Sequence, residues 1–110
     1  MMNNRANLGE FEMLAMLAIL RLAANAYGTT IRREIVDATQ RDVAIAQLYT
    51  TFDRLEAKGF IASRQGEPTP ERGGRAKKYF NVTKSGQQVL NEMLLAYQKL
   101  SRKPLVLAEA

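Results

Sequence analysis

The apolar pattern of the chain leaves helical spacing at Gly59 and returns to it only after Thr83. Before Gly59, apolar side chains recur every three or four residues, as on one face of an α-helix. After it, residues 60–64 and 77–82 have the composition of short strands, with aromatic and β-branched side chains. Two prolines and three glycines in residues 66–75 interrupt any continuous element there, and Gly59 does the same before the first strand. The chain is therefore expected to consist of helices that enclose one β-hairpin.

Four helices are expected from this spacing, and two of them have clear end signals. They are expected at about residues 8–24, 31–39, 44–58 and 84–102. Gly59 suits the position just after the third helix, and Thr83 suits the N-cap of the fourth. Gly28 is expected in a turn where a positive φ is cheap, with Thr29 or Thr30 capping the second helix.

The third helix is expected to have two faces of different chemistry. Its core face is formed by Ile45, Leu48, Phe52 and Leu55. Its far face carries groups that donate and accept hydrogen bonds, namely Gln47, Thr50, Arg54 and Lys58. Tyr49 lies at the boundary, where its ring reaches the core and its hydroxyl is free to point outward.

The excess positive charge is concentrated in the expected hairpin. The chain holds 16 basic and 11 acidic residues, for a formal charge of +5. Residues 60–84 contain six of the basic residues and only two of the acidic ones. A basic run alone is usually a solvated surface, but within a hairpin it suits a polyanionic partner. The side chains with the spacing of phosphates or of a narrow minor groove are Arg72, Arg75, Lys77 and Lys78.

The composition argues against catalysis, metal binding and membrane insertion. The chain has no cysteine and no histidine, so thiolate chemistry, zinc–thiolate sites and the commonest general base are missing. Its carboxylates show no spacing typical of an acid–base pair or a metal site. The longest strongly apolar stretch, residues 13–20, is too short to cross a bilayer, and no targeting segment is recognised. We expect a cytoplasmic protein that is not an enzyme and needs no cofactor.

The expected order of elements is that of a winged helix-turn-helix protein. The fold class is mainly α with a small β-hairpin. Residues 1–83 are expected to form the DNA-binding domain, with the wing at about 60–82. Residues 84–110 are expected to form a C-terminal dimerisation helix and tail. In this plan the third helix enters the major groove of double-stranded DNA and the wing touches the backbone or the minor groove. The alternative is a winged-helix module that binds the acidic surface of another protein. The third helix argues against that alternative, because its exposed arc lacks aromatic anchors.

The fourth helix has an apolar stripe that allows two interpretations. The stripe is formed by Val89, Leu90, Met93, Tyr97 and Leu100. It packs either on the first helix of its own chain or on a second copy of the chain. We favour the second copy, because a long apolar helix at a chain end is more often covered by a partner. A symmetric homodimer would also place two recognition helices about 34 Å apart, one turn of DNA.

Several segments resemble the PadR-like transcriptional regulators in order and spacing. They are residues 8–12, 26–28, 48–49, 54–60 and 74–83. The resemblance implies a bacterial winged-helix repressor that acts as a homodimer, with Tyr49 as a phosphate contact. It also implies release by a small effector, in some relatives an aromatic or drug-like molecule. The family commonly has proline and often a basic residue where this chain has Thr50 and Asp53; Asp53 repels phosphate but could accept from a cytosine amino group.

The candidate DNA contacts also have ordinary structural explanations. Gln47 and Thr50 either read base edges or are simply exposed polar residues. Arg54 either contacts DNA or pairs with an acidic neighbour on its own helix. Arg75, Lys77 and Lys78 have side chains that alternate across the strand, so not all three need face DNA.

Overall fold

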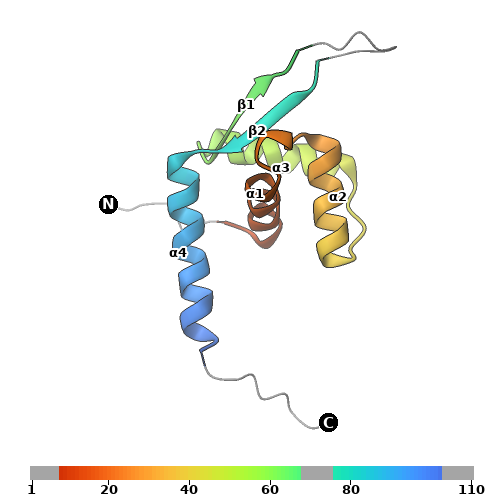
Figure 1. The fold of residues 1–110 in the computed structure, drawn as a ribbon. Coiled ribbons are helices and arrows are strands. Elements are labelled where there is room, and N and C mark those ends of the chain that lie inside the picture. Colours follow the sequence, from red (N-terminus) through yellow and green to blue (C-terminus); the bar gives the residue numbers. More distant parts are fainter. Residues whose placement is uncertain (1–7, 68–75, 103–110) are drawn as a thin grey trace.

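The computed structural model describes residues 8–67 and 76–102 and confirms the expected order of helices and strands. The elements are α1 (Glu10–Leu22), a short 3₁₀ turn η1 (Ala23–Asn25), α2 (Gly28–Thr39), α3 (Ile45–Ala57), β1 (Ile61–Gln65), β2 (Lys78–Val82) and α4 (Lys84–Leu100) (Figure 1). The fold is therefore mainly helical, with one two-stranded antiparallel hairpin. No helix among the described residues is long and apolar enough to cross a membrane.

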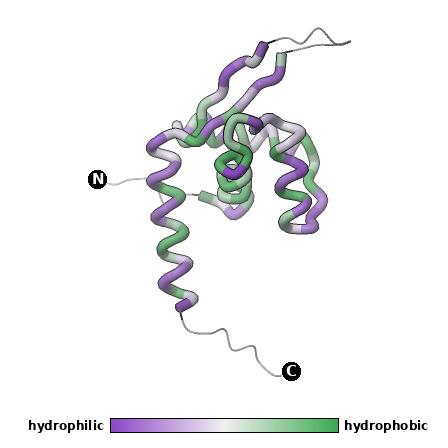
Figure 2. Tube along the Cα trace, in the orientation of Figure 1, coloured by the Kyte–Doolittle hydropathy of each residue, from purple (hydrophilic) through white to green (hydrophobic). Residues whose placement is uncertain are grey.

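The core lies where α1, α2 and α3 meet the inner face of the hairpin. Met16 and Ile19 of α1, Ile31 of α2 and Phe52 of α3 are fully buried there. The Phe52 ring packs against Phe80 of β2 with ring centres 4.2 Å apart, which joins α3 to the hairpin. Figure 2 shows the hydrophobic colour concentrated on α1, the helix at the centre of the molecule.

The hairpin is attached to the start of α2. Its strands pair in antiparallel register, with Ile61 opposite Val82. The segment before α2 adds an isolated bridge between Tyr27 and Tyr79, and the Phe80 amide donates to the Ala26 carbonyl at 2.9 Å. The wing and the beginning of α2 consequently form one connected unit.

The end of α3 and the start of α4 follow the sequence prediction. Gly59 has φ +78°, and its amide and that of Phe60 donate back to carbonyls in the last turn of α3. The Thr83 hydroxyl accepts from the Gly86 amide at 3.0 Å and donates to the Gly59 carbonyl at 2.7 Å. One threonine thus caps α4 and ties it to the end of α3.

The start of α2 differs from the prediction. Gly28 is the first residue of the helix and has no positive φ, and Tyr27, not a threonine, is the N-cap residue. Thr30 stands one turn inside, where its hydroxyl accepts from the Tyr27 amide at 3.0 Å. The physical reason for the glycine is close approach: a Cβ here would overlap the Tyr49 hydroxyl and lie 3.0 Å from its Cζ.

Ile45 was expected in the core, and this prediction is wrong. The residue is 48% exposed at the first position of α3, and Val43 in the preceding loop fills the core instead. The buried face of α3 includes Thr51, whose hydroxyl donates to the Gln47 carbonyl at 2.9 Å. Burial of this threonine rotates the helix relative to the arc predicted from apolar residues alone, which leaves Ile45 at the margin.

The structure divides α4 into an inner part and an outer part. Val89 and Leu90, expected at a partner contact, instead lie buried in the core of their own chain. Met93 is partly buried at the edge of that core. Beyond it the helix extends away from the other elements (Figure 1). The exposed apolar side chains of this outer part are Leu94, Leu95, Tyr97 and Leu100.

Candidate nucleic-acid interface

Three elements adjoin on one side of the fold: α3, the first turn of α2 and the hairpin. The bridge between Tyr27 and Tyr79 holds the hairpin beside the start of α2. The Tyr49 side chain connects α3 to that same turn. These two links place the predicted recognition helix and the predicted wing around a shared junction.

The exposed centre of α3 carries short side chains. The positions opposite its buried face are Ala46, Thr50, Asp53 and Ala57, all exposed. The Thr50 hydroxyl donates to the Ala46 carbonyl one turn earlier, at 3.0 Å. Short side chains at the centre of a helix allow its backbone to approach the edges of bases in a major groove.

Tyr49 stands on one flank of α3, between the core and the start of α2. Its ring meets the Phe52 ring edge-on, with centres 5.4 Å apart, and the residue is 44% exposed. Its hydroxyl does not point simply outward, as the sequence suggested, but lies over Gly28. The hydroxyl therefore sits at the positive end of the α2 dipole, where an anion is favoured.

Gln47 and Arg54 stand on the opposite flank of α3. Both are exposed and line a hollow beside the start of α1. Within the described residues Arg54 forms no ion pair, so pairing on its own helix is not observed. Lys58 on the same flank has a structural contact instead, because its ammonium lies 2.9 Å from the buried Glu12 carboxylate.

The two described lysines of the wing occupy different faces of the hairpin. The Lys77 ammonium lies 4.9 Å from the centre of the Tyr27 ring, beside the first turn of α2. The Lys78 ammonium lies 3.9 Å from the Glu56 carboxylate of α3, which offsets part of its charge. Arg72 and Arg75 lie outside the described residues.

The contribution of α2 was not predicted from the sequence. Arg32 and Arg33 line a hollow together with Ile45, next to the start of α3. The Arg32 Nε donates to the Val43 carbonyl at 2.7 Å and so orders the loop before α3, while Arg33 is exposed. The adjacent basic pair was the only signal in the sequence, and it could not indicate which face the pair would occupy.

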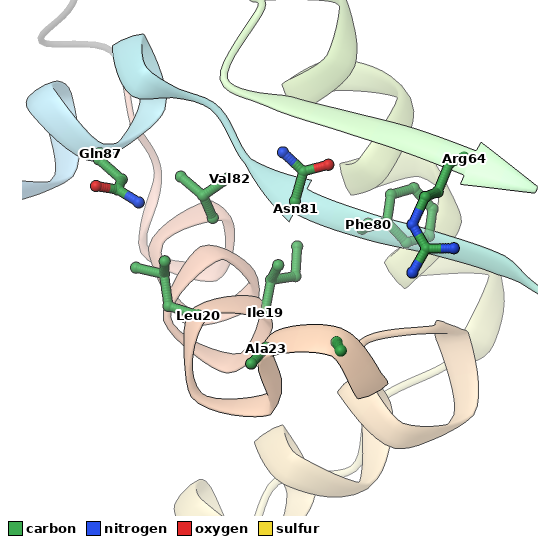
Figure 3. A pocket seen from close by; sticks show the side chains of 9 residues that line it. Ile19, Leu20, Ala23, Arg64, Phe80, Asn81, Val82 and Gln87 are labelled. Carbon is green, nitrogen blue, oxygen red and sulfur yellow. The ribbon is translucent and has the colours of Figure 1, made fainter.

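A third hollow, of about 390 Å³, lies between the end of α1, β2 and the start of α4. Ile19, Leu20 and Val82 supply its apolar surface. Figure 3 shows Gln87 and Arg64 at its opposite ends. Asn81 of β2 also lines the hollow between these two ends, so the hollow is amphipathic, with polar side chains beside its apolar surface. Among residues 8–67 and 76–102, no group of acidic side chains is placed to hold a metal ion.

Three helices followed by a hairpin wing, with exposed polar and basic groups around the third helix, define a winged-helix DNA-binding protein. The sequence matches the model of the transcriptional regulator PadR-like family over residues 16–92, which is more than half of its length. The chain belongs to this family of transcriptional regulators. Family membership implies DNA binding and a protein that is not an enzyme.

Solved structures agree with this assignment. A PadR-like transcription factor from Bacteroides fragilis is 23% identical, with a TM-score of 0.69 and 84% of each chain covered. A PadR family regulator from Clostridium difficile is 21% identical, with a TM-score of 0.66 over 84% of this chain and 92% of that one. One from Eggerthella lenta is 27% identical, with a TM-score of 0.63 over 84% and 80%. No curated protein matches the sequence.

Proposed function

We propose that this protein is a sequence-specific repressor that binds double-stranded DNA as a homodimer in the bacterial cytoplasm. The observation that carries the proposal is the junction at the first turn of α2. Tyr49 of α3 lies over Gly28, and Lys77 of the wing lies over the neighbouring Tyr27. A phosphate at this junction would meet a hydroxyl, a helix N-terminus and an ammonium at once.

In the proposed complex, α3 enters the major groove and the wing follows the backbone. Gln47, Thr50 and Arg54 are the proposed base contacts of α3, and Tyr49 is a phosphate contact. The proposed wing contacts are Arg72, Arg75, Lys77 and Lys78; of the two described lysines, Lys77 lies at the junction with α2, over the Tyr27 ring. Because Lys78 is partly neutralised by Glu56, it should contribute less than Lys77.

The outer part of α4, within residues 84–110, is the proposed dimer contact, whereas its inner part belongs to the core of its own chain. Met93, Tyr97 and Leu100 remain candidates, and exposed Leu94 and Leu95 join them. Four exposed apolar side chains on one projecting helix favour coverage by a second copy. Analytical ultracentrifugation at micromolar concentration should show a dimer, and Leu95→Asp should shift it to monomer. A wild-type protein that sediments only as a monomer would refute this assembly.

The amphipathic hollow beside α4 is the proposed site of a small aromatic or drug-like effector. Its apolar residues suit a ring system, and Arg64 and Gln87 can bind polar substituents at either end. Because the hollow contacts both β2 of the wing and the start of α4, a ligand there would change the angle between the DNA-binding part and the dimer helix. Such a ligand would relieve repression by favouring the geometry that binds DNA less tightly.

DNA binding can be tested by fluorescence anisotropy with a labelled pool of random duplexes over a salt series. We expect affinity to fall steeply with salt and selected sequences to be enriched. Lys77→Ala should reduce the slope of log K against log salt by about one, while Lys99→Ala at the far end of α4 serves as the matched control. No binding at low salt, or binding of an acidic protein in preference to DNA, would refute the proposal.

A further inference from the structure

The exposed centre of α3 presents methyl groups and hydrogen-bond acceptors but no free side-chain donor. Ile45 begins the helix with 48% of its surface exposed, and Ala46 follows it at the exposed centre. Thr50 and Asp53 continue the same line along the helix. The donors Gln47 and Arg54 stand on one flank of α3 instead, and the Tyr49 hydroxyl stands on the other.

The hydrogen-bonding capacity of this centre is restricted by the local contacts. The Thr50 hydroxyl gives its proton to the Ala46 carbonyl at 3.0 Å, so outward it presents a methyl group and an acceptor oxygen. Asp53 is exposed and forms no ion pair or hydrogen bond within the described residues, and its carboxylate only accepts. Both groups therefore require a donor on the DNA.

Ile45 has no role in the core that would explain a large apolar side chain at its position. Val43 fills the neighbouring core position and is 1% exposed, whereas Ile45 lines an open hollow with Arg32 and Arg33. The basic side chains beside it are suited to the DNA backbone. Ile45 thus lies between Arg32 and Arg33, which are suited to the DNA backbone, and the exposed centre of α3. The edge of a base would lie at this place.

The major groove supplies a matching pattern for some bases and not for others. Thymine presents a methyl group, and cytosine and adenine present amino groups, whereas guanine presents only acceptors. A carboxylate suits the cytosine amino group better than the adenine edge, because adenine places the acceptor N7 beside its amino group. Guanine therefore has no complement at the centre of α3.

Resting on the DNA binding proposed above, we propose that Ile45 and Ala46 read thymine methyl groups and that Asp53 reads a cytosine amino group. Asp53 contributes specificity at the expense of general affinity, because its charge repels the phosphates of every duplex. Any guanine contact is left to Gln47 and Arg54 on the flank, because their side chains can donate. The part of the half-site that faces α3 from Ile45 to Asp53 is thus defined by thymine and cytosine.

The test uses the full chain and the duplex enriched from the random pool. Each thymine of that duplex is replaced by deoxyuridine in turn, which deletes only the methyl group. We expect at least one replacement to weaken binding by about fourfold, the effect of about 0.8 kcal/mol for one buried methyl group. In Ile45→Ala the same replacement should have less than a twofold effect. Leu17→Ala, on the exposed side of α1, is the matched control and should keep the fourfold effect.

Asp53 is tested by a second variant, Asp53→Asn. We expect tighter binding to random duplexes and a changed preference from cytosine to adenine at one position, because an amide both donates and accepts. If no deoxyuridine replacement matters, or if the effect persists in both Ile45→Ala and Ala46→Gly, the thymine assignment is overturned. An unchanged base preference in Asp53→Asn overturns the cytosine assignment. These outcomes presuppose duplex binding; if the wild-type protein binds no duplex, the proposed function itself fails.

Discussion

Gly28 leaves space for the Tyr49 hydroxyl at the start of α2. Gly28→Ala should therefore weaken DNA binding without lowering the stability of the fold. The added Cβ would overlap the hydroxyl and lie 3.0 Å from Cζ of the ring. These atoms form the far end of a side chain that is 44% exposed, so the ring can swing aside. The backbone of α2 need not move, and the fold should survive with the hydroxyl displaced.

The size of the effect follows from the contact that is lost. A hydrogen bond to a charged group contributes about 1.5–3 kcal/mol, so loss of a phosphate contact should weaken DNA binding about 10- to 100-fold. Alanine is favoured over glycine in a helix by up to about 1 kcal/mol. The free energy of unfolding in urea should therefore stay equal or rise, while affinity falls.

A double-mutant cycle with Tyr49→Phe identifies the hydroxyl as the cause. Phenylalanine at this position has already lost the phosphate contact, so adding Gly28→Ala should change affinity by less than about twofold. Gly9→Ala is the matched glycine control, because its Cβ would meet only the Glu12 carboxylate, at 3.7 Å. Losses that add in the double variant, or wild-type affinity in Gly28→Ala, would refute the reasoning.

Three further predictions concern the stability of the scaffold and are all checked by urea denaturation. Gly86→Ala should cost about 2 kcal/mol or more, because its Cβ would overlap the Phe60 carbonyl, a backbone atom that cannot rotate away; equal or greater stability would contradict this. Lys58→Met should cost about 3 kcal/mol, because it leaves the Glu12 carboxylate, whose side chain is only 8% exposed, buried without its basic partner. Glu12→Gln should cost only about 1 kcal/mol, because the Lys58 side chain is 30% exposed and its ammonium can reach water. The reverse order would refute this asymmetry. Thr83→Val should cost about 1–2 kcal/mol through loss of the α4 cap, whereas Thr83→Ser should keep most of it.

Features with a local cause could be predicted from the sequence. Gly59 ends α3 at positive φ and Thr83 caps α4, as expected, because each signal depends only on the residues next to it. The two strands and the four helices follow from short-range periodicity in the same way. The basic character of the wing could also be predicted, but the faces on which Lys77 and Lys78 lie depend on Tyr27 and Glu56, which belong to other elements.

Features set by contacts between elements could not be predicted. Gly28 looked like a turn glycine, but its reason is the tyrosine that approaches from α3. Thr51 counted as polar in the sequence, yet it is buried because its hydroxyl is satisfied by the carbonyl of the preceding turn. Its burial moves the exposed centre of α3 from Gln47 and Arg54 towards Thr50 and its neighbours. A prediction based on apolar periodicity cannot detect a polar side chain that satisfies itself within its own helix.

The place of Tyr49 along α3 determines which part of the helix would read sequence in the proposed complex with DNA. Tyr49 lies in the N-terminal half of α3 and meets the first turn of α2, which also carries the bridge to the wing. A phosphate bound at this junction would hold the N-terminal half of α3 close to the DNA, while Ala57 at its other end carries no side chain that could reach a base. Recognition helices contact bases mainly through their N-terminal residues. The methyl groups of Ile45 and Ala46 therefore lie where discrimination between sequences should be strongest, and their exposure has a reason that core packing does not supply.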